Sequence, residues 1–560
     1  MLPLHRFPNL LPRLTVLRTS SSLRLRVLLG MLAAFLVLPV LTVFSAWLPW
    51  QLNDHDALAI VREMAATVLP GYMRTTLLLG VLVAAGAALV GALTAAAVTL
   101  FSFRGRALLE WLLLLPLAMP AYVIAYAYTD FLQFSGPLQT WLRSSFGLQG
   151  RLLPEIRSLS GAVIVFVFAL YPYVYLLART ALSERAAHLM EAARLMGAPL
   201  HRRIWAVALP MARPAVVAGV ALVAMETLAD FGVSSYFGIT TFTTGIYKAW
   251  LSMENHVAAA QLASMLLVLV LVLLQLELRA QRRMRFVTNH VRRAGAADAA
   301  PVPLRGRWCL LAWLVCLLPV LLGFVAPVLF MLRPLGADWS VLPWDRFLQW
   351  AANSVRLGLI SALLAVLVSL LVAYAHRRSA DRFTHWVVQL LGLGYAIPGA
   401  VIVVGLLLPV GWVQQALPQW GVPALLTTTI AGLVWAYMVR FGAVALQSVQ
   451  SGYTRIPASL DESARMLGAG DPRLLLRVHG PLLRRSAITA VLLVLVDVMK
   501  ELPATMVLRP FNSDTLAVVA YQLARDERLS EAALPSLALV LVGLIPVILL
   551  SRELNDSRQR

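Results

Sequence analysis

The sequence predicts an all-α integral membrane protein with about twelve transmembrane helices arranged as two tandem six-helix halves. Of the 560 residues, 60% are hydrophobic and only 13% are charged, which is far more apolar than a soluble domain. The mean hydropathy of +0.78 indicates that the main solvent of the chain is lipid. The apolar residues occur in long runs, and several features of the first half recur in the second.

Twelve apolar segments are long enough, or nearly so, to cross about 30 Å of hydrocarbon at about 1.5 Å per residue. The first follows a basic amino-terminal tail and lacks a convincing small-x-small cleavage site, so it is interpreted as an uncleaved membrane helix. The tenth is the weakest because it is the shortest. The predicted segments are residues 27–49, 75–100, 108–128, 160–178, 214–236, 258–278, 308–332, 357–375, 386–408, 424–439, 486–508 and 534–551.

The basic residues predict the orientation of these segments. The chain has 47 Lys and Arg against 27 Asp and Glu, a net charge of +20. A nucleic-acid-binding surface would cluster this charge among exposed aromatic residues, whereas here it lies between apolar runs. Positive charge is retained on the cytoplasmic side of a membrane, and most of it falls there only if both termini are cytoplasmic. We therefore expect a multi-pass protein in a lipid bilayer, with no nucleic-acid partner.

One loop occurs twice at a constant shift of 271 residues. Both copies are rich in Arg and lie on the predicted cytoplasmic side. The same shift relates two acidic residues of the fifth segment, Glu226 and Asp230, to Asp497 and Glu501 of the eleventh. The matching loop positions are Glu191, Ala192, Ala193, Gly197 and Pro210 in the first copy and Glu462, Ser463, Ala464, Gly468 and Pro481 in the second.

These features divide the chain into two halves with parallel orientation, since each half has an even number of segments. A polar, basic, Ala-rich stretch between the halves reads as a linker. The predicted units are an amino tail (1–26), a first half (27–280) containing the first loop (181–212), a cytoplasmic linker (281–306), a second half (307–552) containing the second loop (447–485), and a carboxyl tail (553–560).

Each loop is predicted to be a bent helix pair that docks on a soluble partner. The Gly lies six residues after the Glu and suits the left-handed end of a short helix. Pro199 and Pro472 then suit the start of the next helix. The alternative is an amphipathic surface hairpin in which Glu462 closes a capping box with Ser459. Identical spacing in two copies on the basic side favours docking.

The loops resemble the EAA motif of permease subunits in bacterial binding-protein-dependent ABC importers. The first copy has Ile204 earlier than the pattern and Val207 in its place, and the second has Ser463 for Ala and Gly480 for Leu. Two fused halves, together with the phrases around residues 225–232, 235–238 and 499–505, resemble the ferric-iron-type importers.

This resemblance implies that the loops are coupling helices inserted into two ATP-binding cassette subunits, and that an external solute-binding protein delivers the solute at the bacterial inner membrane. Lys248 and Lys500 are the only lysines and neither follows Gly, so the chain contains no Walker A loop. The chain is therefore expected to be a permease and not an enzyme, with no catalytic residue and no cofactor of its own. ATP would be used by the partner subunits.

The four acids are a candidate translocation path. A helix leaving the inner interface near Pro210 carries Glu226 and Asp230 into the outer part of the bilayer, and Asp497 and Glu501 repeat that depth. Carboxylate oxygens are hard ligands that suit Fe³⁺ in transit. The alternative is structural: Glu501 would pair with Lys500 or cap a helix break at Pro503, and Asp230 would serve the turn at Gly232.

Other functions remain open at this point. Tyr122, Tyr126 and Tyr128 would favour thiamine through cation–π contacts, or would simply be packing and interface residues. An ion-gradient secondary transporter would use the paired acids but not the docking loops. A membrane-embedded enzyme has no supporting motif. Cys309 and Cys316 are interpreted as core side chains, with no disulfide and no metal.

Overall fold

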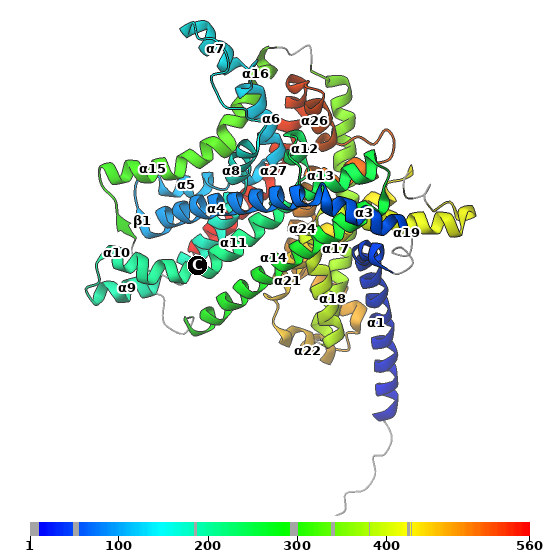
Figure 1. Cartoon of the computed structure of the whole chain (residues 1–560). Coiled ribbons are helices and arrows are strands. Elements are labelled where there is room, and N and C mark those ends of the chain that lie inside the picture. Colours follow the sequence, from blue (N-terminus) through cyan, green and yellow to red (C-terminus); the bar gives the residue numbers. More distant parts are fainter. Residues whose placement is uncertain are drawn as a thin grey trace, which may run out of the picture.

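The computed structural model is an all-helical bundle and describes residues 11–48, 55–183, 187–291, 301–337, 342–379, 381–422, 426 and 428–559 (Figure 1). The described strands are one two-residue parallel pair, β1 (Phe101–Ser102) with β2 (Val302–Pro303). The amino-terminal end of the predicted tail and the centre of the predicted linker lie outside the described residues.

The elements of the first half run from α1 to α14. They are α1 (Leu11–Thr42), η1 (Val43–Trp47), α3 (His55–Ala66), α4 (Leu69–Leu100), α5 (Arg106–Leu112), η2 (Leu115–Ala118), α6 (Ala121–Leu132), α7 (Pro137–Phe146), α8 (Leu159–Ala181), α9 (Ala187–Leu195), α10 (Leu200–Arg203), η4 (Ile204–Ala208), α11 (Leu209–Ala229), α12 (Gly232–Tyr236), α13 (Phe242–Tyr247), η5 (Lys248–Ser252) and α14 (His256–Val291).

The second half repeats this order from α15 to α27. Its elements are α15 (Arg307–Val320), η6 (Leu321–Val325), α16 (Ala326–Ala337), α17 (Trp344–Arg378), α18 (Arg382–Leu393), η8 (Gly394–Ala396), α19 (Gly399–Ala416), η9 (Pro418–Trp420), α21 (Ala431–Tyr453), α22 (Ala458–Met466), α23 (Asp471–Arg473), η10 (Leu474–His479), α24 (Gly480–Lys500), α25 (Pro503–Leu508), α26 (Leu516–Arg525) and α27 (Leu529–Gln559).

Within the described residues, ten helices are long and apolar enough to cross a membrane, and one bent pair raises the number to eleven. The predicted eleventh segment corresponds to α24, which carries Arg484, Arg485, Asp497 and Lys500 and is too charged to count as an isolated apolar span. Two tandem sets of about six membrane helices are thus present, as the sequence predicts.

Two predicted segments, 108–128 and 386–408, are wrong as single helices. Each consists of a short helix, a 3-10 turn and a new helix that begins after a proline, Pro120 or Pro398. In the first of these, the parts before and after the break are bent by 90°. Proline drives the preceding residue out of the helical region, and Met119 and Ile397 are extended, with ψ of 122° and 121°. The breaks therefore repeat in both halves for the same local reason.

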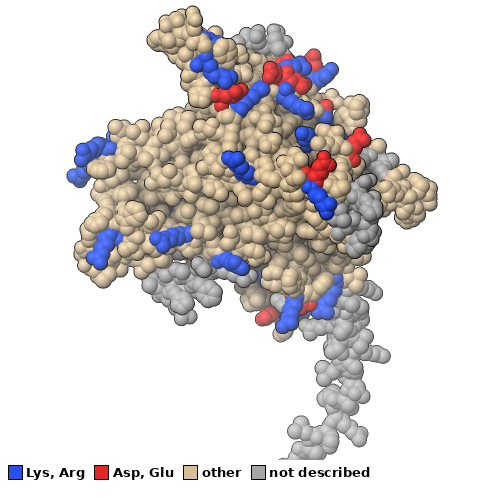
Figure 2. All heavy atoms as spheres, in the orientation of Figure 1, with Lys and Arg blue, Asp and Glu red and all other residues tan. Residues whose placement is uncertain are grey.

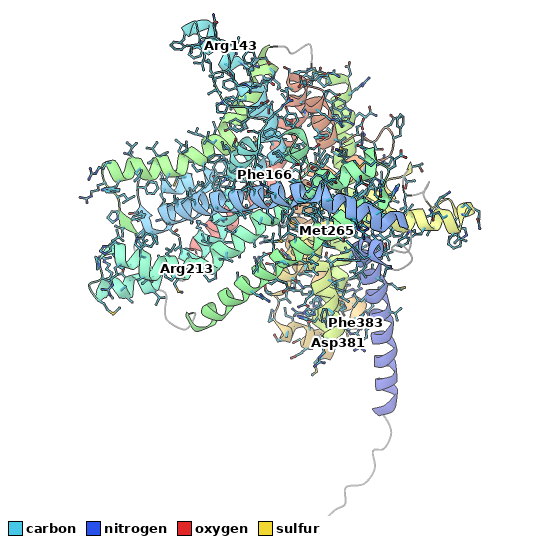
Figure 3. The ribbon with its side chains drawn as sticks, in the orientation of Figure 1. Arg143, Phe166, Arg213, Met265, Asp381 and Phe383 are labelled. Atoms are coloured by element: carbon cyan, nitrogen blue, oxygen red, sulfur yellow. The ribbon has the colours of Figure 1, made fainter. Side chains whose placement is uncertain are left out.

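The first helix of each half packs against the other half. In α1, Arg26 forms a 2.7 Å ion pair with Asp381, and Phe35 stacks on Trp435 at 4.3 Å. Figure 3 labels Asp381 and Phe383 at the start of α18, and the Phe383 ring lies against Gly30 of α1.

The reciprocal contact joins α15 and α16 to the first half. The Trp313 indole donates to the Arg104 carbonyl at 3.0 Å, the Tyr128 hydroxyl donates to the Leu322 carbonyl at 2.7 Å, and Arg333 pairs with Asp130 at 3.3 Å. The two halves are therefore interlocked, an arrangement that the sequence repeat does not reveal. Cys309 and Cys316, both on α15, are free thiols.

Candidate translocation cavity and coupling loops

A cavity of about 200 Å³ lies between the two halves and is lined by all four predicted path residues. The first half contributes η2, the start of α6, one face of α8 and the end of α11. The second half contributes η8, α21 and the junction between α24 and α25. The four acidic lining residues are Glu226, Asp230, Asp497 and Glu501.

Asp230 and Glu501 hold the first turns of the helices that follow them. The Asp230 carboxylate accepts hydrogen bonds from the backbone N–H groups of Val233 and Ser234 at 3.0 and 3.1 Å. The Glu501 carboxylate accepts the N–H groups of Ala504 and Thr505, both at 3.0 Å. The structural alternative raised for these two residues therefore has direct support in the geometry, since carboxylates at helix starts satisfy otherwise unpaired donors.

Glu226 and Asp497 lie one helical turn before these capping residues. Within the described part of the chain, neither carboxylate has a hydrogen bond or an ion pair within 4 Å, although both line the cavity. They are thus the two cavity acids whose carboxylates are not held by a described hydrogen bond or ion pair.

The cavity is also lined by two cationic side chains, Arg440 and Lys500, which the predicted path of four acids did not include. Arg440 donates to Glu501 at 3.1 Å, and that carboxylate is only 1% exposed. The Lys500 ammonium reaches across to the first half and donates to the Leu117 carbonyl at 3.1 Å. Glu501 therefore pairs with Arg440 and not with Lys500.

Both cations interrupt the 271-residue repeat. Their counterparts in the first half are Ala169 and Ala229, and both alanines also line the cavity. The acids of the cavity are therefore contributed equally by the two halves, whereas both cationic side chains come from the second half. The charge distribution across the cavity is asymmetric.

Three tyrosines, Tyr122, Tyr173 and Tyr395, complete the polar lining. The Tyr122 hydroxyl donates to the Lys500 carbonyl at 3.1 Å. Of the other tyrosines considered for thiamine, Tyr126 packs edge-on against Tyr236 at 4.7 Å, and Tyr128 is bonded to the Leu322 carbonyl. Among the described residues, no group of three His, Cys, Asp or Glu side chains is placed to hold a metal ion.

Both predicted loops contain the same helix ending. Gly197 and Gly468 have φ of 80° and 81°, in the left-handed region that favours glycine. In the first loop the N–H groups of Gly197 and Ala198 donate to the carbonyls of Arg194 and Ala193 at 2.9 and 3.0 Å.

The second loop repeats these bonds from Gly468 and Ala469 to Arg465 and Ala464, again at 2.9 and 3.0 Å. This pair of bonds is a Schellman motif, which ends α9 and α22 in the same geometry. The capping-box alternative for Glu462 is wrong, because α22 begins after Pro457 and has no side-chain cap.

Each loop continues into a helix that reaches the cavity. After its Gly, the first loop passes through α10 and a π-helical turn into α11, which begins with Leu209-Pro210. The second passes through α23 and another π-helical turn into α24, which begins with Gly480-Pro481. Glu191 and Glu462 lie on α9 and α22, before the bend. In each half, the part of the loop after its Gly is therefore nearly continuous with the helix that leads to the cavity acids.

An exposed apolar pair lies beside each Gly, which sequence reasoning missed. Leu195 and Met196 are 82% and 80% exposed, and their counterparts Met466 and Leu467 are 90% and 89% exposed. The same 271-residue shift relates the two pairs and was the signal available in the sequence. Figure 2 shows basic side chains at the lower left, where α9 and α10 lie, and both acidic and basic side chains at the top, near α7 and α26.

In comparison with known proteins, one family model matches two separate parts of the chain. The model of the family "binding-protein-dependent transport system inner membrane component" matches residues 87–286 and 365–554. The chain is similar to the Fe(3+)-transport system permease protein FbpB 2 of Haemophilus influenzae, with 23% identity over 86% of this chain and 89% of the relative.

Two shorter relatives match part of the chain. The putative 2-aminoethylphosphonate transport system permease protein PhnV of Salmonella typhimurium is 29% identical over 37% of this chain and 74% of its own length. PhnU of the same organism is 26% identical over 44% of this chain and 90% of its own length. Because the family model covers well over half of the residues, the chain belongs to the family of binding-protein-dependent transport system inner membrane components, as a fused permease with two copies of the domain.

Proposed function

We propose that this chain is the permease of an ATP-driven importer that moves ferric iron into the cytoplasm. Two ATP-binding subunits would dock on the first loop (181–212) and the second loop (447–485), and an external solute-binding protein would deliver the solute at the opposite end. Both termini would be cytoplasmic. The observation that carries the proposal is the pair of matched loops. Each loop has an exposed apolar pair beside its Gly and leads into a cavity-lining helix.

The proposed mechanism follows from this continuity. Closure of the two ATPases would bring α9 and α22 together, and α11 and α24 would transmit the movement to the cavity. Glu226 and Asp230 lie at the carboxyl end of α11, and Asp497 and Glu501 lie at the carboxyl end of α24. Opening would therefore separate the acids of one half from those of the other, which suits brief contact with a cation and not tight binding.

Ferric iron is favoured over other solutes by two observations. Glu226 and Asp497 line the cavity without a described hydrogen bond or close ion pair, and carboxylate oxygens are hard ligands that suit Fe³⁺. The relative named as a Fe(3+) permease also matches along almost the whole chain.

A second candidate solute is a small zwitterion such as 2-aminoethylphosphonate. Arg440 and Lys500 would suit an anionic group, and the unpaired acids would suit an ammonium group. The two relatives named as phosphonate permeases belong to the same family. Thiamine is less well supported, because only Tyr122 of its three candidate tyrosines lines the cavity.

The solute is tested by uptake in a strain that lacks the chain, with and without the restored gene. Radiolabelled ferric iron, 2-aminoethylphosphonate and thiamine would be supplied separately. We expect the gene to restore iron uptake and expect deletion of the partner ATPase to abolish it. Restored phosphonate or thiamine uptake without iron uptake would replace the solute, and uptake that persists without the ATPase would indicate a secondary transporter.

Docking is tested with the double variant Gly197→Asp/Gly468→Asp, with Gly197→Asn/Gly468→Asn as its matched control. A Cβ added at either Gly meets nothing within 4 Å, so a side chain there would enter the space proposed for the partner without a clash inside this chain. Asp and Asn both tolerate the left-handed conformation and differ mainly in charge.

We expect both variants to insert normally into the membrane. The Asp variant should lose copurification of the ATPase and lose uptake, because a carboxylate would be desolvated in the partner's groove. The Asn variant should retain part of both. Copurification of the ATPase with the Asp variant at the wild-type yield would contradict docking through these loops.

A further inference from the structure

The second loop is tied to its own half by a polar cluster that has no counterpart among the described residues of the first loop. The cluster consists of Arg377 at the end of α17, Asp461 on α22 and His479 at the end of η10. These three residues come from elements well separated in the sequence and meet at the base of the loop. We call this cluster the loop clamp.

Asp461 is the centre of the loop clamp. Arg377 donates to its two carboxylate oxygens at 2.7 and 3.1 Å, the paired geometry that makes arginine–carboxylate contacts strong and directional. The Nε2 atom of His479 lies 2.9 Å from the same carboxylate, and the imidazole is fully buried. Burial by itself raises the pKa of Asp461, but the hydrogen bonds from Arg377 and His479 outweigh it and hold the pKa below its usual range.

The clamp also fixes the end of α21. The Arg377 guanidinium donates to the carbonyls of Tyr453, Ile456 and Pro457 at 3.2, 2.9 and 3.1 Å, so one side chain binds both the segment that enters α22 and the helix before it. The hydroxyl of Tyr453 lies 3.3 Å from Nδ1 of His479. Four elements of the second half, α17, α21, α22 and η10, therefore share one hydrogen-bonded network.

A neighbouring contact strengthens the attachment of α23 to α17. Arg378 pairs with Asp471 at 2.7 Å, and the Tyr374 hydroxyl donates to the same carboxylate at 3.0 Å. Both sides of the bend at Gly468 are thus bound to the end of α17.

The first loop has apolar residues at the matching places. The 271-residue shift relates Asp461 and His479 to Met190 and Ala208, which are 7% and 1% exposed. Thr76 and Ser354 accept equivalent backbone hydrogen bonds, and this correspondence relates Arg377 to Thr99. Among the described residues of α9, the ion pairs are limited to Glu191 with Arg194, 3.6 Å apart on the same helix.

We propose that Arg377, Asp461 and His479 are positioning residues that make the second loop move as one body with α17 and α21, so that ATPase movement reaches the cavity mainly through the second half. The inference rests on the proposed coupling role of the loops. A hydrogen-bonded clamp resists bending in a way that apolar contacts of Met190 and Ala208 do not, because it fixes direction as well as distance. The more compliant first loop would follow.

The first arm of the test measures structure and needs no partner. Hydrogen–deuterium exchange of the purified chain in nanodiscs would compare α22 with α9 in the same molecule. We expect α22 to exchange more slowly than α9, and Asp461→Asn to raise exchange in α22 about tenfold, as expected for the loss of charge-assisted hydrogen bonds. Glu155→Gln, which weakens an exposed 3.2 Å pair with Arg151, is the control and should change neither helix.

A triple variant guards against misfolding of the single one. Arg377→Thr/Asp461→Met/His479→Ala places the matching residues of the first half at the three clamp positions. None of the three clamp charges then remains buried without its partner. It should insert normally and raise the exchange of α22 to the level of α9. Asp461→Glu keeps the charge and should restore part of the protection.

The second arm measures coupling in proteoliposomes that contain the chain, its ATPase and an iron-loaded binding protein. For Asp461→Asn and the triple variant we expect the ATPase to remain bound and to hydrolyse ATP, while iron transported per ATP falls about tenfold. Unchanged exchange in α22, or raised exchange with unchanged iron per ATP, would overturn the proposal. Failure of the wild-type chain to transport iron or bind the ATPase would instead overturn the proposed function, which the first arm does not depend on.

Discussion

At the residue scale, the ion pair between Arg440 and Glu501 combines two roles in one place. Glu501 caps α25 and is nearly inaccessible, and Arg440 neutralises its charge at the cavity wall. Breaking such a buried pair from one side leaves an uncompensated charge, which costs more than the pair itself contributes.

Arg440→Met should destabilise the protein by about 3 kcal/mol, because the Glu501 carboxylate remains buried without a cation. Arg440→Met/Glu501→Gln should recover a large part of that loss. The midpoint of thermal unfolding in detergent measures both variants. Equal midpoints for the single and double variants would show that Glu501 does not depend on Arg440.

The pH dependence of the second loop is a residue-scale prediction for Asp461. Its folded pKa lies below its unfolded value, so its charged form stabilises the fold at a pH above about 4 and this contribution is lost as the pH falls through the folded pKa. The groups facing it are Arg377 and His479, with the hydroxyl of Tyr453 behind His479.

The difference in unfolding midpoint between the wild type and Asp461→Asn should therefore stay constant from pH 8 to pH 5 and shrink below about pH 4. A series of thermal unfolding curves in one detergent measures it. A difference that disappears between pH 7 and pH 5 would contradict the role given to the Asp461 carboxylate.

At the scale of elements, the acids near the ends of α11 and α24 divide into capping residues and proposed path residues. Asp230 and Glu501 hold the starts of α12 and α25, whereas Glu226 and Asp497 hold no described backbone group. Loss of uptake after removing Asp230 or Glu501 would therefore mix folding with transport. Glu226 and Asp497 separate the two.

Asp230→Ala should destabilise the protein by about 1 kcal/mol, the usual cost of losing a helix cap. Glu226→Gln/Asp497→Asn should leave the unfolding midpoint close to the wild type and reduce ferric iron uptake at least severalfold at equal protein levels. Uptake near the wild type in this double variant would remove the acids from the translocation path.

The sequence predicts these elements unevenly, and the reason is physical. Repeated spacing identifies the loops, their glycines and all four cavity acids, because a duplicated segment keeps its local geometry. Arg440 and Lys500 escape the same reasoning, since their counterparts Ala169 and Ala229 carry no charge. Hydropathy also joined the pieces on either side of Pro120 and Pro398, because an apolar run does not record where a proline ends its helix.

At the scale of the whole molecule, the exchange of first helices makes the two halves depend on each other. The duplicated sequence suggests two units that fold separately. Instead, α1 packs against α18 and α19 of the second half, and α15 and α16 pack against α4 and α6 of the first half. Two further hydrogen bonds cross between the halves: the Tyr247 hydroxyl donates to the Pro503 carbonyl at 2.6 Å, and Ser235 bonds to Tyr521 at 2.8 Å.

This interlocking predicts the behaviour of a chain divided in the linker. Residues 1–291 and 301–560, expressed together as two polypeptides with a tag on one, should copurify and support uptake, because the crossing contacts do not require a covalent link. Each fragment expressed alone should be degraded or aggregate, since one face of its bundle would lack its covering helix. Size-exclusion chromatography in detergent measures both outcomes.

A further division tests the exchange itself. Moving the cut to residue 338, so that α15 and α16 stay with the first half, should give fragments that are more stable alone than those cut at the linker. The first half then keeps the segment whose Trp313 and Arg333 bind Arg104 and Asp130, and whose Leu322 carbonyl accepts from Tyr128. Halves that merely lie side by side would show the reverse, since the cut would then remove α15 and α16 from the half that they complete.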